Sequence, residues 1–370
     1  MNTQFQVFKN KVEHCLCTPG DGVFTVNTAK ERKAALRNKL YGQTENVDEL
    51  WRTSLNELPN SPHKAVLLGI SSDCGGGILR GANWGPLFLR SALIDQQSQC
   101  HSFDLGDVRV IPHLLHDKYL NETTITNCQK ALYGNENSDY YVSPLSITED
   151  VCDSFYTTFK NKGIFGIGGD HSISYPLTKA YLKAKREQGK RTAIIHFDAH
   201  TDLLVERLGI DLCFGSWCTH ILEFLPAPHH LIQFGIRSSG KPKSHWETTF
   251  GVKQHWAHEI IERGASAVAA DVIAQLKADN VDELYVSFDI DALDAQFASA
   301  TGTPESNGLT PQHALDILSA LAGEFPITGA DMMEIAPFTD SSLVGQASCE
   351  TTLREGAKIS AFLINAINAS

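Results

Sequence analysis

Short apolar runs alternate with stretches of helical periodicity from Lys64 to the end of the chain. Several of the runs are apolar on both faces, which is typical of parallel strands covered by helices. Thr310 and Pro311 form a good helix start, because threonine caps a helix and proline suits its first turn. The alternation predicts an α/β fold with a mostly parallel sheet and helices on both faces. The predicted strands are residues 65–70, 163–167, 192–197, 230–236, 284–290 and 327–335, and the predicted helices are residues 174–188, 260–278, 311–322 and 351–367.

Residues 1–60 are polar and show only one clear helical pattern, near residues 30–40. We therefore interpret residues 1–60 as an N-terminal extension without a core of its own, and residues 61–370 as the main domain. Such an extension is expected to cover a neighbouring subunit or the mouth of the functional site.

The composition narrows the classes of partner. The chain has 370 residues, 42% of them hydrophobic, and a net charge of −12, so neither nucleic acid nor an anionic membrane is expected as a partner. No apolar run is long enough for a membrane span, and residues 1–13 lack a signal-type apolar stretch. Nine cysteines without a repeated spacing are expected to be reduced thiols, which favours a cytoplasmic location.

Acidic and histidine residues directly follow three of the predicted strands. The clusters are Gly-Gly-Asp-His-Ser at residues 168–172, Asp-Ala-His-Thr-Asp at residues 198–202 and Asp-Ile-Asp at residues 289–291. Ligands gather at the carboxyl ends of strands in open α/β sheets, and alternate side chains of an extended chain point the same way. Six side chains are therefore expected to converge: His171, Asp198, His200, Asp202, Asp289 and Asp291.

These residue types favour a metal centre. A single Asp-x-Asp at a strand end is more often a turn feature, but three such clusters on three strands are hard to explain in that way. Four carboxylates would neutralise two divalent cations, and without metal they would repel one another and have raised pKa values. Carboxylate and imidazole ligands suit manganese.

Three segments resemble the signature motifs of the ureohydrolase (arginase and agmatinase) family. They are residues 168–172, 196–202 (His-Phe-Asp-Ala-His-Thr-Asp) and 287–294 (Ser-Phe-Asp-Ile-Asp-Ala-Leu-Asp). Residues 301–305 resemble the loop after the third motif, and Gly75-Gly76-Gly77 with residues 80–86 resembles a glycine-rich segment of the family. The similarity spans about residues 64–368. It implies that residues 61–370 are an arginase-like α/β/α catalytic domain, assembled as a homotrimer or homohexamer.

The resemblance also assigns roles to individual residues. It implies two Mn²⁺ ions per subunit, with Ni²⁺ as the alternative. One ion would be held by His171, Asp198, Asp202 and Asp289, and the other by His200, Asp198, Asp289 and Asp291. The ions would lower the pKa of a water molecule toward ~7, so that it attacks a guanidino carbon and urea is released. Asp202 would orient that water, and Glu334 would bind the guanidinium of the substrate.

Two departures from the family pattern concern proton transfer and the substrate. Where the family has a His-Gly pair after the second motif, this chain has Phe214 and Gly215, so His220 is the candidate catalytic proton carrier. Residues 203–205 (Leu-Leu-Val) offer nothing to the carboxylate of arginine. We therefore expect a small cationic guanidino substrate such as agmatine, guanidinobutyrate or free guanidine. Phe214 and Trp217 are expected to contact it in a tight aromatic pocket.

Three other functions stay open at this stage. One is a formimidoylglutamase-type amidine hydrolase, although the first motif is Gly-Gly-Asp-His rather than Gly-Gly-Gly-His. Another is a non-catalytic metal-binding partner subunit of the same fold, which the missing shuttle histidine favours. The third is a zinc deacetylase of related fold, which would need one metal and fewer acidic ligands.

Overall fold

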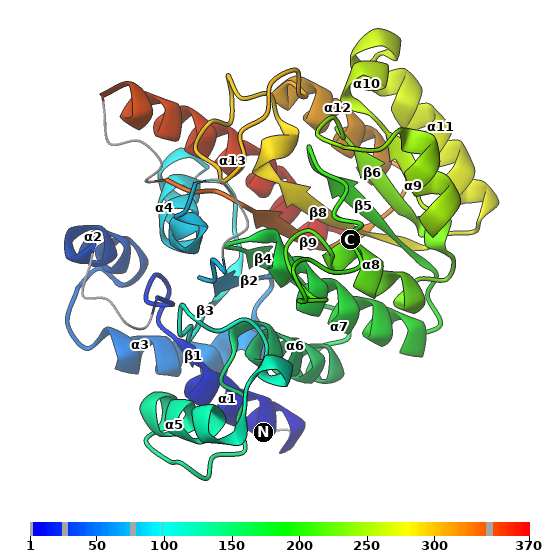
Figure 1. Cartoon of the computed structure of the whole chain (residues 1–370). Helices are drawn as coiled ribbons and strands as arrows, with labels where there is room; N and C mark the ends of the chain where they lie inside the picture. Colours follow the sequence, from blue (N-terminus) through cyan, green and yellow to red (C-terminus); the bar gives the residue numbers. More distant parts are fainter. Residues whose placement is uncertain (1–2, 24–28, 75–78, 98, 338–342) are drawn as a thin grey trace.

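A nine-stranded sheet forms the centre of the computed structural model, which describes residues 3–23, 29–74, 79–97, 99–337 and 343–370 (Figure 1). The strand order is β1-β3-β2-β4-β9-β8-β5-β6-β7, and every neighbouring pair is parallel except β1 and β3. The strands are β1 (Leu16–Cys17), β2 (Ala65–Ile70), β3 (Phe103–Val108), β4 (Gly163–Ile167), β5 (Thr192–Phe197), β6 (Leu231–Phe234), β7 (Lys253–His255), β8 (Glu283–Asp289) and β9 (Ile327–Met333).

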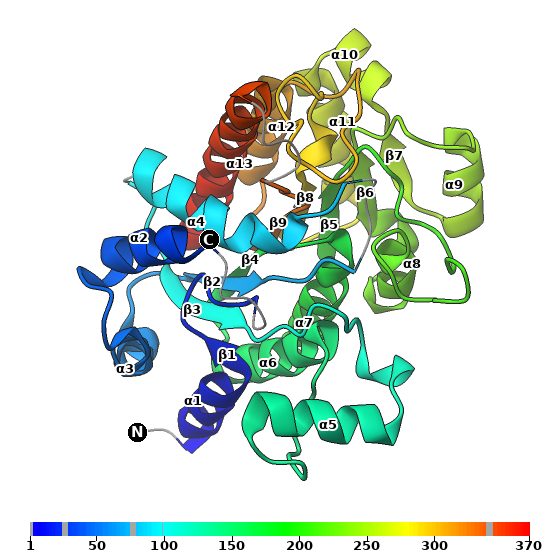
Figure 2. The ribbon, with the colours of Figure 1, turned by 60° about the vertical axis from the view of Figure 1, so that its left-hand side comes forward.

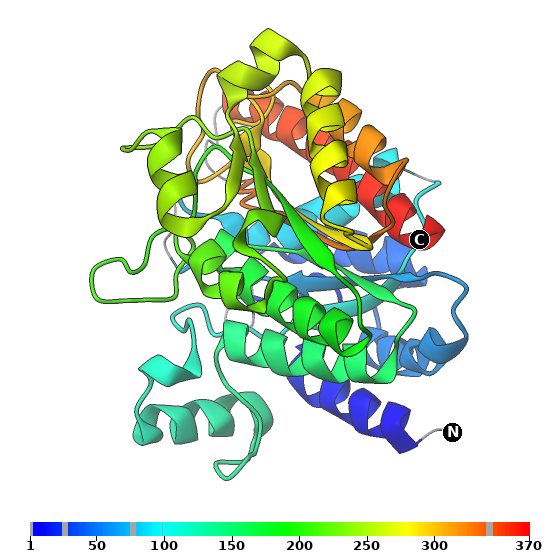
Figure 3. The same cartoon turned by 90° about the vertical axis from the view of Figure 1, so that its right-hand side faces the viewer.

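Helices cover both faces of the sheet, as Figures 1 and 3 show. Side chains of one strand alternate between two cores: Val66 and Leu68 of β2 belong to one apolar cluster, and Ala65 and Leu67 to the other. The first cluster is closed by α1 (Thr3–Cys15), α6 (Pro144–Thr158), α7 (Ser174–Glu187) and α8 (Trp217–Ile221), and the second by α4 (Gly85–Gln96), α10 (Ala257–Arg263), α11 (Ala265–Ala278), α12 (Pro311–Ala322) and α13 (Leu343–Ala369). The predicted α/β architecture is confirmed.

The predicted elements differ from the structure in informative places. The predicted helix 260–278 is two helices, because Gly264 has φ +85° and ends α10. Strand β3 escaped prediction because it carries acidic residues that pair with a buried cation. Arg90 of α4 lies 2.5 Å from Asp107 and 2.8 Å from Asp104, and neither Arg90 nor Asp107 is exposed by more than 1%. The acidic residues of β3 therefore make this buried strand look exposed in the sequence.

Residues 1–60 contribute to the main core. Three helices form here rather than one: α1, α2 (Lys30–Tyr41) and α3 (Val47–Ser54). Helix α1 lies against α6 (Figure 2), where Phe8 packs edge-on against Phe155 and Phe159. Trp51 of α3 is buried and donates its indole N–H to the Leu105 carbonyl at 3.2 Å. The extension therefore packs its apolar side chains onto the core of the main domain, because a few periodic apolar residues among polar ones suffice to bury one face of α1.

Replacing Phe8 with alanine is expected to lower the free energy of unfolding by about 3–5 kcal/mol, because the large side chain is 1% exposed. Denaturant unfolding would measure the change. Val7→Ala is the matched control: its side chain is 61% exposed, so the effect should stay within about 0.5 kcal/mol. A Phe8→Ala protein as stable as the control would show that α1 adds nothing to the core.

The topology places the site at the carboxyl ends of the central strands. Strands β4, β9, β8 and β5 are consecutive neighbours and parallel, so their carboxyl ends lie side by side. The loops that follow them carry the predicted metal and substrate residues. Among the helices of the described residues, none is long and apolar enough to cross a membrane.

Candidate metal centre and substrate pocket

Four central strands deliver the acidic and histidine residues to one place. His171 follows β4 in a short turn capped by Asp170, whose carboxylate accepts the Ser172 backbone N–H at 3.0 Å. Asp198 directly follows β5, and Asp289 is the last residue of β8. All six predicted ligands converge, and all but His200 are buried. Gly75-Gly76-Gly77, which resembles a family segment, lies outside the described residues.

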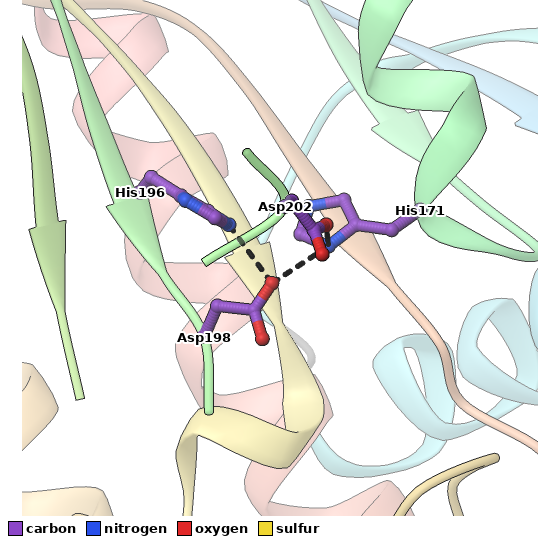
Figure 4. A group of neighbouring side chains, drawn as sticks. All are labelled: His171, His196, Asp198 and Asp202. Carbon is purple, nitrogen blue, oxygen red and sulfur yellow. Dashed lines mark hydrogen bonds and ion pairs between the residues drawn. The ribbon is translucent and has the colours of Figure 1, made fainter. Parts of the chain in front are cut away.

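His171 faces three carboxylates. Its Nδ1 lies 3.1 Å from Asp198 Oδ2, 3.2 Å from Asp202 Oδ2 and 3.1 Å from Asp289 Oδ2. Figure 4 shows His171, Asp198 and Asp202 pointing toward one another. This is the first of the two ligand sets implied by the family resemblance.

His200 faces the opposite side of Asp198. Its Nδ1 lies 3.3 Å from Asp198 Oδ1 and 3.2 Å from Asp291 Oδ2. Asp198 therefore presents one oxygen to each imidazole, as a bridging ligand would. Asp289 Oδ2 faces His171, and its Oδ1 accepts the Asp291 backbone N–H at 2.8 Å, as Asp198 Oδ1 accepts that of His200 at 2.6 Å. Among the described ion pairs, His200 has one with Asp198 and one with Asp291 but none with Asp289. The contacts of Asp289 thus favour the first ligand set.

The electrostatics of the site fit divalent cations. Burial and the neighbouring carboxylates of Asp291 and Asp198 raise the pKa of Asp289 well above its ordinary value. Burial lowers the pKa of His171, but the carboxylates around it raise that pKa well above the ordinary value. His171 Nδ1 is nevertheless buried without a well-aligned hydrogen bond. Protons would have to neutralise these groups in place of metal, and carboxylate with imidazole suits Mn²⁺ or Ni²⁺.

His196 belongs to the site and was not predicted as a site residue. Its Nε2 lies 3.0 Å from Asp198 Oδ2 (Figure 4). The amide of Gln233 donates to its Nδ1 at 2.8 Å. The Gln233 bond leaves Nε2 as the protonated nitrogen, so His196 donates to Asp198 and orients it. The signal was present in the sequence, because His196 lies in β5 two residues before Asp198, and alternate side chains of an extended chain face the same side.

Trp217 lies behind the ligands rather than in the pocket wall. It has no exposed surface, and its indole N–H donates to Asp202 Oδ2 at 2.8 Å. Its ring is 5.0 Å from that of His171 and 5.1 Å from that of His196. The expected contact of Trp217 with substrate is therefore corrected: the tryptophan positions Asp202.

Trp217→Phe is expected to weaken metal binding about tenfold to hundredfold, because it keeps the ring but removes the hydrogen bond that orients Asp202. Metal titration followed by elemental analysis would measure this loss. Trp246→Phe is the matched control, since it removes an indole bond to Ser239 Oγ and touches none of the six ligands. Equal metal affinity in the two variants would contradict the positioning role of Trp217.

His220 points away from the pocket. Its Nε2 lies 2.9 Å from the Asp211 backbone carbonyl and its ring lies against Tyr175. It does not line the cavity beside the metal ligands, so its predicted role as proton carrier is corrected. The reason is that His220 lies in α8, where its ring is held by the Asp211 carbonyl and Tyr175 instead of facing the cavity. Phe214, by contrast, does line the cavity.

Glu334 lies at the inner end of the cavity. It directly follows β9 with φ +64°, a conformation that L-residues rarely adopt and that marks functional positions. Its Oε1 accepts the His171 backbone N–H at 2.9 Å, and its own N–H donates to the Gly169 carbonyl at 2.8 Å. Burial, followed by Asp289 and Asp170, raises the pKa of Glu334 well above its ordinary value. The carboxylate is thus held between the ligands and the cavity, where a cation would stabilise its charge.

The cavity above these groups has a volume of about 740 Å³. Its walls include Leu204, Phe214 and Trp246, whereas Leu203 is buried in the core. The expected tight pocket is therefore corrected: a space of this size holds a substrate longer than a guanidinium.

Comparison with known proteins agrees with this geometry. The family model described as "Arginase family" matches residues 63–363. An agmatinase of Bacillus subtilis (strain 168) is 33% identical over 213 residues, covering 56% of this chain and 67% of that protein. An agmatinase of Salmonella newport (strain SL254) is 35% identical over 196 residues, covering 52% of this chain and 58% of that protein. The chain thus aligns with little more than half of the Salmonella relative.

Solved structures share the fold over most of the chain. Proclavaminate amidino hydrolase from Streptomyces clavuligerus superposes with a TM-score of 0.61 at 25% identity, covering 83% of this chain and 92% of that one. Formimidoylglutamase from Bacillus subtilis gives a TM-score of 0.62 at 20% identity, covering 83% and 88%, a likeness of fold alone. With a family match over residues 63–363 and the six predicted ligands brought together at the carboxyl ends of the central strands, the chain belongs to the arginase family of ureohydrolases.

Proposed function

We propose that this chain hydrolyses a guanidino C–N bond and releases urea. The observation that carries the proposal is the placement of Glu334: its carboxylate lies at the inner end of a substrate-sized cavity, beside Asp289 and the backbone of His171. A carboxylate there can accept two N–H groups of a planar guanidinium. The relatives named agmatinase support the same reaction class.

The ligand geometry supports a pair of ions, Mn²⁺ by preference and Ni²⁺ as the alternative. His171, Asp202 and Asp289 would hold one ion, His200 and Asp291 the other, and Asp198 would bridge them. The resemblance further implies that Asp289 bridges. When bound, two divalent ions supply a nucleophilic water at neutral pH by lowering its pKa toward ~7.

The side chains of this chain would perform the remaining work. Glu334 would bind the guanidinium and hold its carbon over the ions. Asp202 has one oxygen fixed by Trp217, and its other oxygen would orient the attacking water. The apolar wall at Leu204 and Phe214 would exclude bulk water from the reacting carbon.

A urea-release screen with Mn²⁺- and Ni²⁺-loaded protein tests the proposal. The compounds would be arginine, agmatine, guanidinobutyrate and free guanidine, with formimidoylglutamate assayed for formamide. Urea from a guanidino compound other than arginine is the expected result. Formamide as the main product would favour the amidine hydrolase. A protein that binds two ions and turns over none of the compounds would favour the non-catalytic partner subunit, and one bound ion would favour the deacetylase-like alternative.

A further inference from the structure

Charge in the cavity is divided by depth. The carboxylates that line it are buried: Asp198, Asp202, Asp289 and Glu334. The lysine and arginine that line it are Arg207 and Lys241, and both are exposed. The cavity is therefore acidic at its inner end and basic at its lip.

Arg207 is held in place by its loop. Its backbone N–H and carbonyl pair with those of Ile210 at 2.8 and 3.0 Å, across a turn in which Leu208 and Gly209 have positive φ. Its guanidinium lies 4.9 Å from the ring centroid of Phe214. Within the described part of the chain, no carboxylate forms an ion pair with Arg207. The cation is thus positioned at the lip without an acidic partner.

Lys241 sits on a similarly braced loop. Ser239 Oγ donates to the Lys241 carbonyl at 2.7 Å, accepts its N–H at 3.2 Å and accepts the Trp246 indole N–H at 2.9 Å. The neighbouring Ser238 Oγ donates to the Glu305 carboxylate at 2.8 Å. No described carboxylate pairs with the Lys241 ammonium.

We propose that Arg207 and Lys241 form a subsite for an anionic group at the far end of the substrate. The inference rests on the proposed guanidino hydrolysis and names its substrate class: an ω-guanidino carboxylic acid. Two exposed cations that pair with no described carboxylate line the same cavity in a chain of net charge −12. They would attract a carboxylate and repel the ammonium of agmatine. A cavity of about 740 Å³ leaves room for an alkyl stem along Leu204, Phe214 and Trp246.

The inference separates this chain from its agmatinase relatives. Agmatine carries a cation at each end and would place its ammonium beside Arg207 and Lys241. A carboxylate at the end of the same stem would match both ends of the cavity. Both compounds carry the same guanidinium for Glu334. The charges of Arg207 and Lys241 at the lip therefore determine which of the two is preferred.

Three compounds with a four-carbon alkyl stem isolate the charge at the far end: 5-guanidinopentanoate, agmatine and the neutral butylguanidine. The kcat/KM for urea release is expected to be highest for 5-guanidinopentanoate, intermediate for the neutral butylguanidine and lowest for agmatine. Lys241→Gln should lower the carboxylate-to-ammonium ratio roughly tenfold, since one exposed charge is worth about threefold toward each end group. Arg207→Gln with Lys241→Gln should lower it further. Added salt should shrink the ratio in the unmodified protein.

Lys253→Gln is the matched control, because this exposed lysine on β7 is outside the cavity. Calorimetric binding of the same compounds to metal-loaded protein provides a readout that is independent of turnover. Preferred binding of 5-guanidinopentanoate that is lost in the double variant and kept in the control supports the subsite, whether or not urea forms. If this binding pattern is found but no urea is released, only the proposed function is refuted. The subsite would be refuted if agmatine were bound or hydrolysed no less efficiently than 5-guanidinopentanoate. It would also be refuted if Lys241→Gln left the carboxylate-to-ammonium ratio unchanged.

Discussion

Asp198→Asn should leave the protein unable to hold either metal ion. The two oxygens of Asp198 face different imidazoles, 3.1 Å from His171 and 3.3 Å from His200, so one substitution removes a ligand from both sets. Changes that only misorient a ligand weaken metal binding tenfold to hundredfold, and the loss of a bridging carboxylate should exceed the upper figure at both positions. Elemental analysis after dialysis would show the loss of both ions, and urea release should fall to background.

Asp291→Asn is the matched control for this prediction. Asp291 lies 3.2 Å from His200 and makes no ion pair with His171, so its removal should empty one position and leave the other filled. Stability supplies an independent readout, because bound metal adds RT ln(1 + [L]/Kd) to the free energy of unfolding. A chelator should lower the Tm of the unmodified protein and leave that of Asp198→Asn unchanged. An Asp198→Asn protein that keeps one tightly bound ion would exclude the bridging role.

The convergence of the six predicted ligands could be foreseen because each lies at or just after a strand end. Asp198 and Asp289 terminate strongly apolar strands, and parallel strands must bring such residues to one edge. The same alternation reaches His196, whose position two residues before Asp198 places it on the ligand side. Where the backbone is a regular strand, the spacing of residues in the sequence determines which side chains point the same way, and the residues that converge can be predicted.

In loops, the spacing of residues in the sequence does not predict where a side chain points. Trp217 begins the short helix α8 and His220 is its last residue but one, after an irregular segment. Nothing in the spacing reveals that Trp217 bonds to Asp202 while His220 contacts the Asp211 carbonyl. Arg207 and Lys241 likewise owe their place at the lip to two loop conformations. The convergence of the candidate metal ligands therefore follows from the strands, whereas the residues proposed to select the substrate lie on loops whose conformation the sequence pattern does not predict.

The same contrast explains residues 1–60. The family match begins at residue 63, and the polar composition before it suggests an appendage. Yet Phe5, Phe8 and Val12 recur at helical spacing and are at most 5% exposed against α6. A short amphipathic helix needs only a narrow apolar face, which an overall polar composition hides.

Glu334→Gln should retain both ions and lose most of the turnover. Glutamine keeps an oxygen that accepts the His171 backbone N–H, so the local backbone and the ligands are expected to stay in place. It loses the negative charge that would pair with a guanidinium at the inner end of the cavity. Hydrogen bonds to charged groups are worth about 1.5–3 kcal/mol, so kcat/KM for guanidino substrates should fall roughly tenfold to a hundredfold. Steady-state kinetics on protein with verified metal content would measure this.

The division of that loss between kcat and KM tests the role of Glu334 further. If the carboxylate binds the guanidinium equally in the ground state and the transition state, KM should rise while kcat stays unchanged, whereas a contact that tightens as the carbon becomes tetrahedral should lower kcat. We expect the second pattern, because the buried charge lies beside Asp289 and the reacting centre rather than at the lip. His220→Ala is the control: the side chain lies outside the cavity, so kcat/KM should change by less than about twofold. Normal turnover in Glu334→Gln with both ions bound would remove Glu334 from the site of guanidinium binding.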